Sequence, residues 1–283
     1  MARGIVEKKV YKTGLDPGYK TDVICIEEPL EIILQYGHAT QLIKKSIAIV
    51  MRTPGEEEEL ILGFLFNEGI LDHPTDQIAS IDLKFSYNDA ELSQQTAIVT
   101  LKPGIIPKLE HADRMGMRNS SCGICGRSSI ENMLDQCNFI LKKSSPQIAL
   151  NLIYTLPSKL SSVQSAFVAT GGAHCCAIFD SAGNLKDWSE DVGRHNALDK
   201  LIGKVILKKI MPLSDHLILL SGRASFELIH KAYMVGCPIV IALGAPSSLA
   251  IETAEACNMT LVGFLKNDKA NIYSAEERIL QTA

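Results

Sequence analysis

Cys122 and Cys125 form a C-x-x-C motif, a spacing used in metal binding, redox exchange and sulfur transfer. They lie within the segment RNSSCGICGRSS, residues 118–129. This segment is small, polar and glycine-containing, so it is typical of an exposed loop rather than of core. Gly123 and Gly126 let the backbone open around the two sulfurs. Two cysteines packed as small hydrophobic residues are not expected in so polar a stretch.

Two of the three chemical interpretations of this pair meet difficulties. Structural zinc needs four ligands in a closed tetrahedron, and the chain has no second C-x-x-C. His174, Cys175 and Cys176 are consecutive on a predicted strand, where neighbouring side chains point to opposite faces. A thioredoxin-like redox pair normally follows a strand of a βαβ unit rather than lying in a soft polar loop. Both interpretations stay open behind the third.

The third interpretation is nucleophilic sulfur transfer. A thiolate accepts a sulfane sulfur from a donor and passes it on by exchange, which requires reach and exposure more than rigidity. Arg118, Arg127 and the N-terminus of a short helix expected after Ser128 all favour the thiolate over the thiol. The residues around the pair therefore favour sulfur transfer.

Two more polar loops each follow an apolar strand and lead into a helix. They have the sequences SGRAS at 221–225 and LGAPSS at 243–248. A parallel sheet places both at one edge, where ligands bind in such folds. Their N–H groups at helix N-termini suit phosphate or another anion, and Arg223 can add a bidentate contact. Neither loop has a Walker or G-x-G-x-x-G pattern, which excludes an ordinary ATPase or dehydrogenase.

A dense polar run, EDVGRHN at 190–196, stands just before another expected helix. A helix start alone explains Asp191. The remaining acid, base, imidazole and amide groups predict a functional or interdomain cluster. For His195, a hydrogen-bonded structural role is favoured over that of a general base.

The first part of the chain is expected to be mainly β. The runs 23–26 and 30–34 suggest a hairpin or a bent strand pair. A helix is expected to begin at Thr53 as N-cap, with Pro54 in its first turn and Glu56 completing a capping box. Further strands are expected at 46–51, 78–87 and 96–101.

In the last part, strands and helices alternate. The runs 175–179 and 185–188 predict a β-hairpin, and a helical connector near 144–160 is expected to break at Pro157. Fully apolar strands alternating with helices predict a parallel sheet covered on both faces. The expected strands are 217–220, 239–243 and 261–264, and the expected helices lie at 198–206, from near 225, and at 248–256.

The fold class is therefore α/β or α+β in two lobes. The N-terminal lobe is expected to be β-rich with one or two helices. The predicted divisions are a β-rich lobe at 1–117, the cysteine loop and helical connector at 118–165, and a ligand-binding lobe at 166–283.

Composition narrows the possible functions. The chain of 283 residues is 46% hydrophobic and 21% charged, which is ordinary for a globular protein. A net charge of −4 and a pI near 6.0 argue against bulk nucleic-acid binding. With no long apolar run and no apolar region behind the basic N-terminus, we expect a cytoplasmic protein with no membrane partner. Eight cysteines are too few for a disulfide scaffold in that compartment.

Taken together, these motifs resemble the FdhD family of accessory sulfurtransferases for formate dehydrogenases. Several of the strings are individually rare, and they follow the family's order over nearly the whole chain. They are CGICG at 122–126, GGAH at 171–174, the polar run at 190–196 with Ala197, Asp199 and Lys200, SGRAS at 221–225, APSS at 245–248, and LVGF at 261–264 followed by NIY at 271–273.

The resemblance implies an activity. The family takes persulfide sulfur from a cysteine desulfurase and delivers it to the bis-molybdopterin guanine dinucleotide cofactor of formate dehydrogenase. Cys122 would carry the persulfide, and Cys125 would share or resolve the sulfur. The family forms homodimers and has a C-terminal lobe with a three-layer αβα sheet like that of cytidine deaminases. For this protein we expect no metal ion of its own.

The cofactor-binding stretch of the family matches residues 264–269. Lys266 and Lys269 depart from the expected arginines, which keeps the charge but loses the planar fork. With the two strand-end loops, the expected ligand residues are Phe264, Leu265, Lys266, Asn267, Asp268, Lys269, Ser221, Arg223, Ser225, Ser247 and Ser248.

Three other functions compete with sulfur transfer. Zinc-dependent deamination needs H-x-E or C-x-E before P-C-x-x-C, but here the C-x-x-C precedes His174, Ser121 replaces the proline and position 176 is cysteine. A non-catalytic chaperone would keep the ligand loops but make the cysteines dispensable. A zinc-binding scaffold would use the cysteines as ligands.

Overall fold

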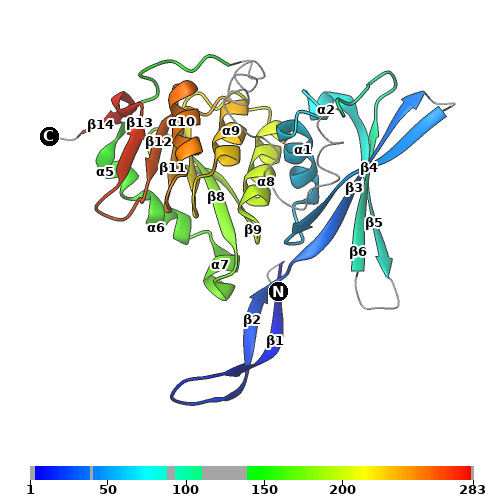
Figure 1. Ribbon diagram of the computed structural model, residues 1–283, viewed down its shortest axis with the longest axis horizontal. Coiled ribbons are helices and arrows are strands. Elements are labelled where there is room, and N and C mark those ends of the chain that lie inside the picture. Colours follow the sequence, from blue (N-terminus) through cyan, green and yellow to red (C-terminus); the bar gives the residue numbers. More distant parts are fainter. Residues whose placement is uncertain (1–3, 39–40, 88–92, 110–138, 282–283) are drawn as a thin grey trace.

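Two large sheets dominate the described part of the chain. The computed structural model describes residues 4–38, 41–87, 93–109 and 139–281. One sheet has four strands in the order β4-β3-β6-β5, and the other has six in the order β13-β12-β11-β10-β8-β9. In Figure 1 the two sheets stand side by side with α1 and α8 between them. The fold is mixed α/β, as expected.

The four-stranded sheet covers α1 with one face. Leu30, Ile32 and Leu34 alternate along β3 and are fully buried against Leu60 and Ile61 of the helix. This alternation is typical of a sheet with one face on the core and the other in water. The elements are β3 (Glu28–His38), β4 (Gln41–Arg52), α1 (Glu57–Asn67), α2 (Pro74–Gln77), β5 (Ile78–Tyr87) and β6 (Ser93–Leu101).

The six-stranded sheet is mixed. Its central strands β10, β11 and β12 are parallel, and β8, β9 and β13 run antiparallel to their neighbours. The predicted parallel sheet is therefore correct only for the centre, while the predicted hairpin of β8 and β9 is confirmed. The strands are β8 (His174–Asp180), β9 (Leu185–Asp191), β10 (His216–Leu220), β11 (Ile239–Ala242), β12 (Thr260–Gly263) and β13 (Asn271–Ser274).

Helices cover both faces of this sheet. Ile218 and Leu220 pack with α8, α9 and α10, whereas Leu217 and Leu219 pack with α5 and α6. Both sides of each central strand are thus buried, which explains their unbroken apolar runs. The helices are α5 (Leu150–Ile153), α6 (Leu156–Ser161), α7 (Ser165–Thr170), α8 (Arg194–Leu207), α9 (Phe226–Met234) and α10 (Ser248–Ala256).

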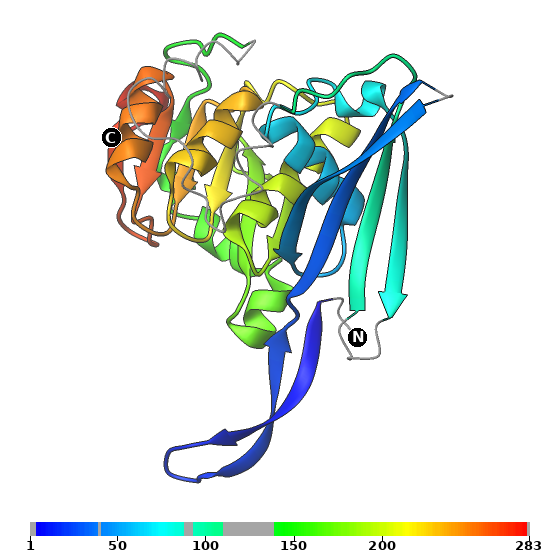
Figure 2. The same ribbon diagram turned by 45° about the vertical axis from the view of Figure 1, so that its right-hand side comes forward.

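Smaller elements complete the fold. The strands β7 (Ile148–Ala149) and β14 (Ile279–Leu280) pair with each other, and a short 3-10 helix covers Glu276–Arg278. The strands β1 (Ile5–Lys12) and β2 (Gly18–Cys25) pair as an antiparallel ribbon. Figures 1 and 2 show this ribbon projecting from the body.

Some local predictions were wrong. The run 23–26 does not form a hairpin with 30–34, because β2 pairs with β1 and β3 pairs with β4 and β6. Thr53 does not cap α1, whose N-cap is Glu56 in a left-handed conformation without a side-chain cap bond. The helical connector does break as predicted, but just before Pro157: α5 ends at Ile153 and α6 begins at Leu156, with Pro157 in its first turn. The helix expected after Ser128 lies outside the described residues.

Two glycines bring α1 and α8 into backbone contact. A Cβ atom on Gly63 would lie 1.9 Å from the carbonyl oxygen of Asp199, and one on Gly203 would lie 1.9 Å from that of Glu59. Neither distance is possible for real atoms, so the two helices can cross this closely only with glycine at both positions. This crossing joins the two sheets.

Candidate functional site at the ends of the central strands

Three loops meet where β10, β11 and β12 end, and we call residues 221–225, 243–247 and 264–270 the strand-end loops. Backbone hydrogen bonds join them side by side. Gly244 N donates to Gly222 O at 3.0 Å, Ser247 N to Ala224 O at 3.0 Å, and Phe264 N to Gly244 O at 3.0 Å. The first two loops thus share one edge of the sheet, as the sequence predicted, and the third loop extends it.

Gly244 allows this close approach of the loops. A Cβ atom there would lie 2.9 Å from Gly222 O and 3.0 Å from Arg223 N. A side chain at this position would push the first two loops apart. The glycine of the second loop is therefore required by packing between the loops as much as by the turn.

Two helices begin at this edge, and each has a serine at its N-cap. Ser247 Oγ caps α10 by accepting a hydrogen bond from Ala250 N at 3.2 Å. Ser225 occupies the same position at α9 but makes no side-chain cap bond. Ser248 and Arg223 are exposed beside them. The edge combines helix N-termini with a guanidinium, a combination that suits an anionic ligand.

Ser221 has a structural partner as well. Its Oγ accepts a hydrogen bond from Cys175 N at 2.9 Å, which ties the first loop to the neighbouring strand β8. The hydroxyl can still donate one hydrogen bond. Of the predicted serines, Ser221 and Ser247 use their oxygens within the protein.

The third loop presents an exposed aromatic ring and several charged groups. Phe264 adopts a left-handed backbone conformation, with φ at 53°, and its side chain is 45% exposed. Leu265 is buried in the core, so its side chain faces away from the loop surface. The remaining predicted ligand residues of this loop are exposed, namely Lys266, Asn267, Asp268 and Lys269.

His174 stands next to the first loop. A Cβ atom on Gly222 would lie 3.2 Å from its Nδ1, so the ring packs directly on this glycine. Burial, together with the nearby Arg194, lowers the pKa of His174. At neutral pH the imidazole is therefore uncharged and can both donate and accept. The sequence indicated His174 as part of the GGAH string and as a candidate zinc ligand, but not as a neighbour of the first strand-end loop.

The polar run at 190–196 joins the two sheets. Asp191 is fully buried, and its Oδ2 lies 2.7 Å from Lys200 Nζ and 3.0 Å from Thr53 N. Asn196 Nδ2 donates to Met51 O at 2.7 Å. These bonds connect β9 and α8 to the end of β4. An interdomain cluster was one of the two predicted roles, and these contacts support it.

Thr53 shows why the expected helix cap did not form. Its backbone N–H donates to Asp191, its Oγ1 accepts from Val192 N at 3.0 Å, and its carbonyl accepts from Lys200 Nζ at 2.8 Å. These partners lie at the end of β9 and in α8, far from Thr53 in the sequence. Tertiary contacts therefore take the place of the local capping box.

The cysteine motif cannot be placed, because Cys122 and Cys125 lie outside the described residues. Four of the described cysteines are buried, and burial raises the pKa of the Cys237 thiol to about 12. Burial also raises the pKa values of Cys175 and Cys176. These three thiols remain protonated at neutral pH and are poor nucleophiles.

Among the described residues, no group of three or more His, Cys, Asp or Glu side chains could hold a metal ion. Cys122 and Cys125 lie outside these residues, so the zinc alternative is not tested by this finding. No described helix is long and apolar enough to cross a membrane.

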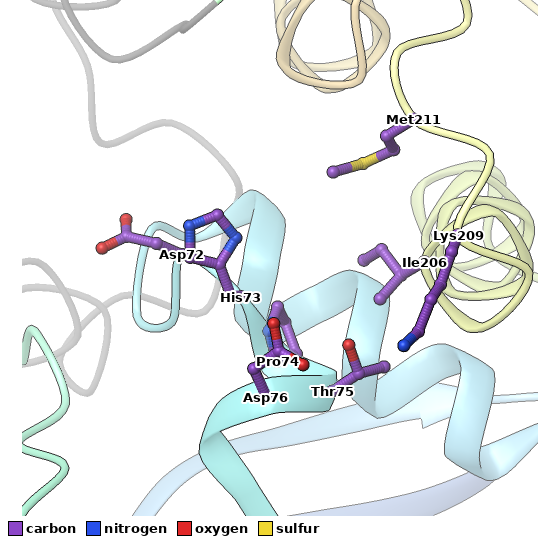
Figure 3. A pocket seen from close by; sticks show the side chains of 8 residues that line it. All are labelled: Asp72, His73, Pro74, Thr75, Asp76, Ile206, Lys209 and Met211. Atoms are coloured by element: carbon purple, nitrogen blue, oxygen red, sulfur yellow. The ribbon is translucent and has the colours of Figure 1, made fainter.

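A shallow cavity of about 220 Å³ lies between α2 and the C-terminal end of α8. Figure 3 shows its side chains, including His73, Asp76 and Lys209. A helix of the length of α8 spans about 20 Å. The cavity is therefore at the opposite end of α8 from the strand-end loops and does not form part of the same site.

Comparison with known proteins identifies the family. The profile of the FdhD/NarQ family matches residues 25–280. A protein of Picrophilus torridus named sulfur carrier protein FdhD is 39% identical over 275 residues, which cover 97% of this chain and 98% of that protein. One of Streptomyces avermitilis with the same name is 38% identical, covering 92% of this chain and 90% of the relative.

A solved structure has the same fold. The crystal structure of a candidate formate dehydrogenase accessory protein from Desulfotalea psychrophila matches with a TM-score of 0.70 and 21% identity. The match covers 98% of this chain and 99% of the other. On the evidence of the profile and the relatives, the chain belongs to the FdhD/NarQ family.

Proposed function

We propose that this protein is a sulfurtransferase that carries persulfide sulfur from a cysteine desulfurase to the bis-molybdopterin guanine dinucleotide cofactor and so supports formate dehydrogenase. Family membership and the relatives' name, sulfur carrier protein, support sulfur transfer. The structural observation that carries the proposal is the set of three joined strand-end loops, which offers a binding edge for an anionic cargo.

The cargo suits this edge chemically. A guanine dinucleotide brings phosphates, which helix N-termini and backbone N–H groups favour. Arg223 can contact phosphate oxygens through its planar fork, and Lys266 and Lys269 add point charges. The exposed ring of Phe264 provides an apolar face against which a base can stack.

The sulfur step would occur on Cys122. Its thiolate attacks the terminal sulfur of the desulfurase persulfide, a new S–S bond forms on Cys122, and the donor cysteine leaves as a thiolate. Cys125 would then share or resolve this sulfur. The buried cysteines described above are unsuited to this role, since their raised pKa values keep them protonated.

Mass spectrometry tests the transfer directly. After incubation with a cysteine desulfurase and cysteine, the wild-type protein should gain the mass of one sulfur atom on the peptide that contains Cys122. The Cys122→Ala variant should fold normally, lack this adduct and fail to support formate dehydrogenase. Full dehydrogenase activity with this variant would instead favour the non-catalytic chaperone, which uses only the ligand loops.

We also propose a cytoplasmic homodimer whose other partners are the desulfurase and the catalytic subunit of formate dehydrogenase. The β1–β2 ribbon supports the proposal that the protein binds another protein chain. Its large side chains Tyr11, Leu15 and Tyr19 are mostly exposed and could be covered by such a partner. A two-stranded ribbon is only marginally stable in water by itself. Light scattering during size-exclusion chromatography would give the oligomeric state, and a monomer at micromolar concentration would rule out the homodimer.

A further inference from the structure

Ser225 and Ser247 occupy equivalent positions but use their hydroxyl groups differently. Ala224 and Pro246, the residues just before them, form a parallel β-bridge, so the two serines stand side by side at the starts of α9 and α10. Both have extended backbone conformations, with ψ at 164° and 161°. Ser247 caps its helix, whereas Ser225 does not. Backbone geometry therefore does not explain the difference.

A histidine accounts for the different orientation of Ser225. His195 Nε2 lies 3.4 Å from Ser225 Oγ and 2.8 Å from Glu227 Oε2. An ionised carboxylate only accepts hydrogen bonds, so Nε2 carries the hydrogen and donates it toward Glu227. The oxygen of Ser225, 3.4 Å from Nε2, can accept from the same N–H group only as its second and weaker acceptor. Its own hydrogen is left to be donated elsewhere.

His195 itself is held in place by its neighbours. It is the second residue of α8, between Arg194 and Asn196, and Asn196 is bonded to Met51 O and to Asp191. His195 and Glu227 are 22% and 30% exposed, so the pair is partly shielded from water but remains next to the strand-end loops. The cluster that joins the two sheets thus anchors the start of α8, which carries His195, and the contact with Glu227 orients the imidazole.

We propose that His195 is a positioning residue, which keeps the Ser225 hydroxyl turned away from its helix and toward a phosphate group bound at the strand-end loops. This inference rests on the proposed cargo site. A hydroxyl that donates to a charged phosphate makes a stronger bond than one used in a neutral contact. Ser225 would therefore contact the ligand, and His195 would act through Ser225 without touching it.

Calorimetric titration with guanosine diphosphate tests the inference. The Ser225→Ala variant should bind about tenfold more weakly, which corresponds to the loss of one hydrogen bond to a charged group. His195→Ala should weaken binding by about three- to tenfold, since the hydroxyl loses its orientation. His195→Gln, which keeps an N–H donor near the position of Nε2, should restore most of the affinity.

The double variant separates a positioning role from a general effect on folding. If His195 acts through Ser225, the pair Ser225→Ala and His195→Ala together should bind no more weakly than Ser225→Ala alone. Additive losses would overturn the inference, as would unchanged affinity in either single variant. Melting temperatures of the unliganded variants serve as folding controls. If His195→Ala unfolds, His195→Gln keeps the test possible, because loss of affinity in that folded variant would overturn the inference.

Failure of the cargo proposal would look different. If the wild-type protein binds inorganic pyrophosphate but not guanosine diphosphate, the guanine assignment is wrong, and the same variants are then compared with pyrophosphate. If neither probe binds at millimolar concentration, no phosphate is held at this edge and the role of His195 falls with it.

Discussion

The Nζ atom of Lys231 lies 2.7 Å from both carboxylate oxygens of Asp199, inside the seam between α1, α8 and α9. Both side chains are almost fully buried, and Asn67 Nδ2 adds a hydrogen bond to Asp199 Oδ1 at 2.6 Å. Burial opposes the charge on Lys231, but Asp199 together with Glu68 and Glu227 outweighs burial and raises the pKa of the lysine. The pair therefore stays ionised and bridges the seam.

Removing one partner of this pair should be costly, because the other charge remains buried and uncompensated. We expect Lys231→Met to lower the free energy of unfolding by about 3–5 kcal/mol. Lys12→Met is the matched control. Lys12 forms an exposed ion pair with Asp22, which water screens, so its loss should cost far less than the loss of Lys231. Urea denaturation gives the free energy of unfolding of both variants. Equal decreases in this free energy would contradict a stabilising role for the buried Lys231–Asp199 pair.

The crossing of α1 and α8 gives a second prediction. Gly63→Ala places a methyl group against the backbone oxygen of Asp199, which cannot move like a side chain. Overpacking costs about 1–3 kcal/mol, more than the roughly 1 kcal/mol that alanine contributes to an isolated helix. We therefore expect a lower melting temperature for Gly63→Ala. Gly172→Ala, with its nearest neighbour at an ordinary 3.5 Å, should change it little.

Asp180 predicts a specific sensitivity to acid. Burial alone would raise its pKa, but hydrogen bonds from Lys186 and Asn184 outweigh burial and lower it. A carboxyl group with a lowered pKa in the folded state stabilises the fold above its unfolded pKa of about 3.9, and this stability is lost as the pH falls below that value.

Asp180→Asn isolates this contribution. The amide oxygen can still accept from Ala182 N and Asn184 N, which bond to Oδ1 at 3.0 and 2.8 Å. The variant removes the charge beside Lys186 and also the hydrogen bond from Asn184 Nδ2 to Oδ2, but only the loss of the charge depends on pH. The variant should be less stable than wild type at pH 7, and the difference should shrink below about pH 4. Unfolding free energies measured between pH 3 and 7 check this, and a gap that stays constant with pH would exclude the carboxylate as its source.

The sequence predicted the C-terminal sheet well because its central strands are buried on both faces and carry unbroken apolar runs. The strand-end loops could be predicted because Gly and Ser residues follow β10 and β11 and interrupt these apolar runs. Local patterns failed where distant contacts decide. Thr53 had good capping-box spacing, but Asp191 and Lys200 bind its polar groups.

The β1 strand was missed for a different reason. Its residues between Glu7 and Lys12 are mostly charged and exposed, because the projecting ribbon has no buried face to impose an alternating pattern. For His195 the sequence favoured a hydrogen-bonded structural role, but it could not give the partners. Its partners Ser225 and Glu227 lie about thirty positions further along the chain and meet it only because α8 and α9 start at the same sheet edge.

Ligand binding at the strand-end loops should stabilise the protein, because a ligand that binds only the folded state shifts the unfolding equilibrium. We expect guanosine diphosphate at millimolar concentration to raise the melting temperature of the wild-type protein. Arg223 is exposed in the first loop and makes the sharpest test of the phosphate contact. Arg223→Gln removes its charge and should abolish most of the shift, whereas Arg223→Lys keeps the charge without the fork and should retain part of it.

Salt provides an independent check on the same contact. For the wild-type protein, the rise in melting temperature caused by guanosine diphosphate should become smaller as ionic strength increases, because salt screens exposed charge contacts. For Arg223→Gln, this rise should depend less on salt. Lys102, which is exposed at the end of the distant strand β6, supplies the matched control, and Lys102→Gln should leave the shift unchanged. Equal shifts for wild type and Arg223→Gln would show that any nucleotide binds away from this loop.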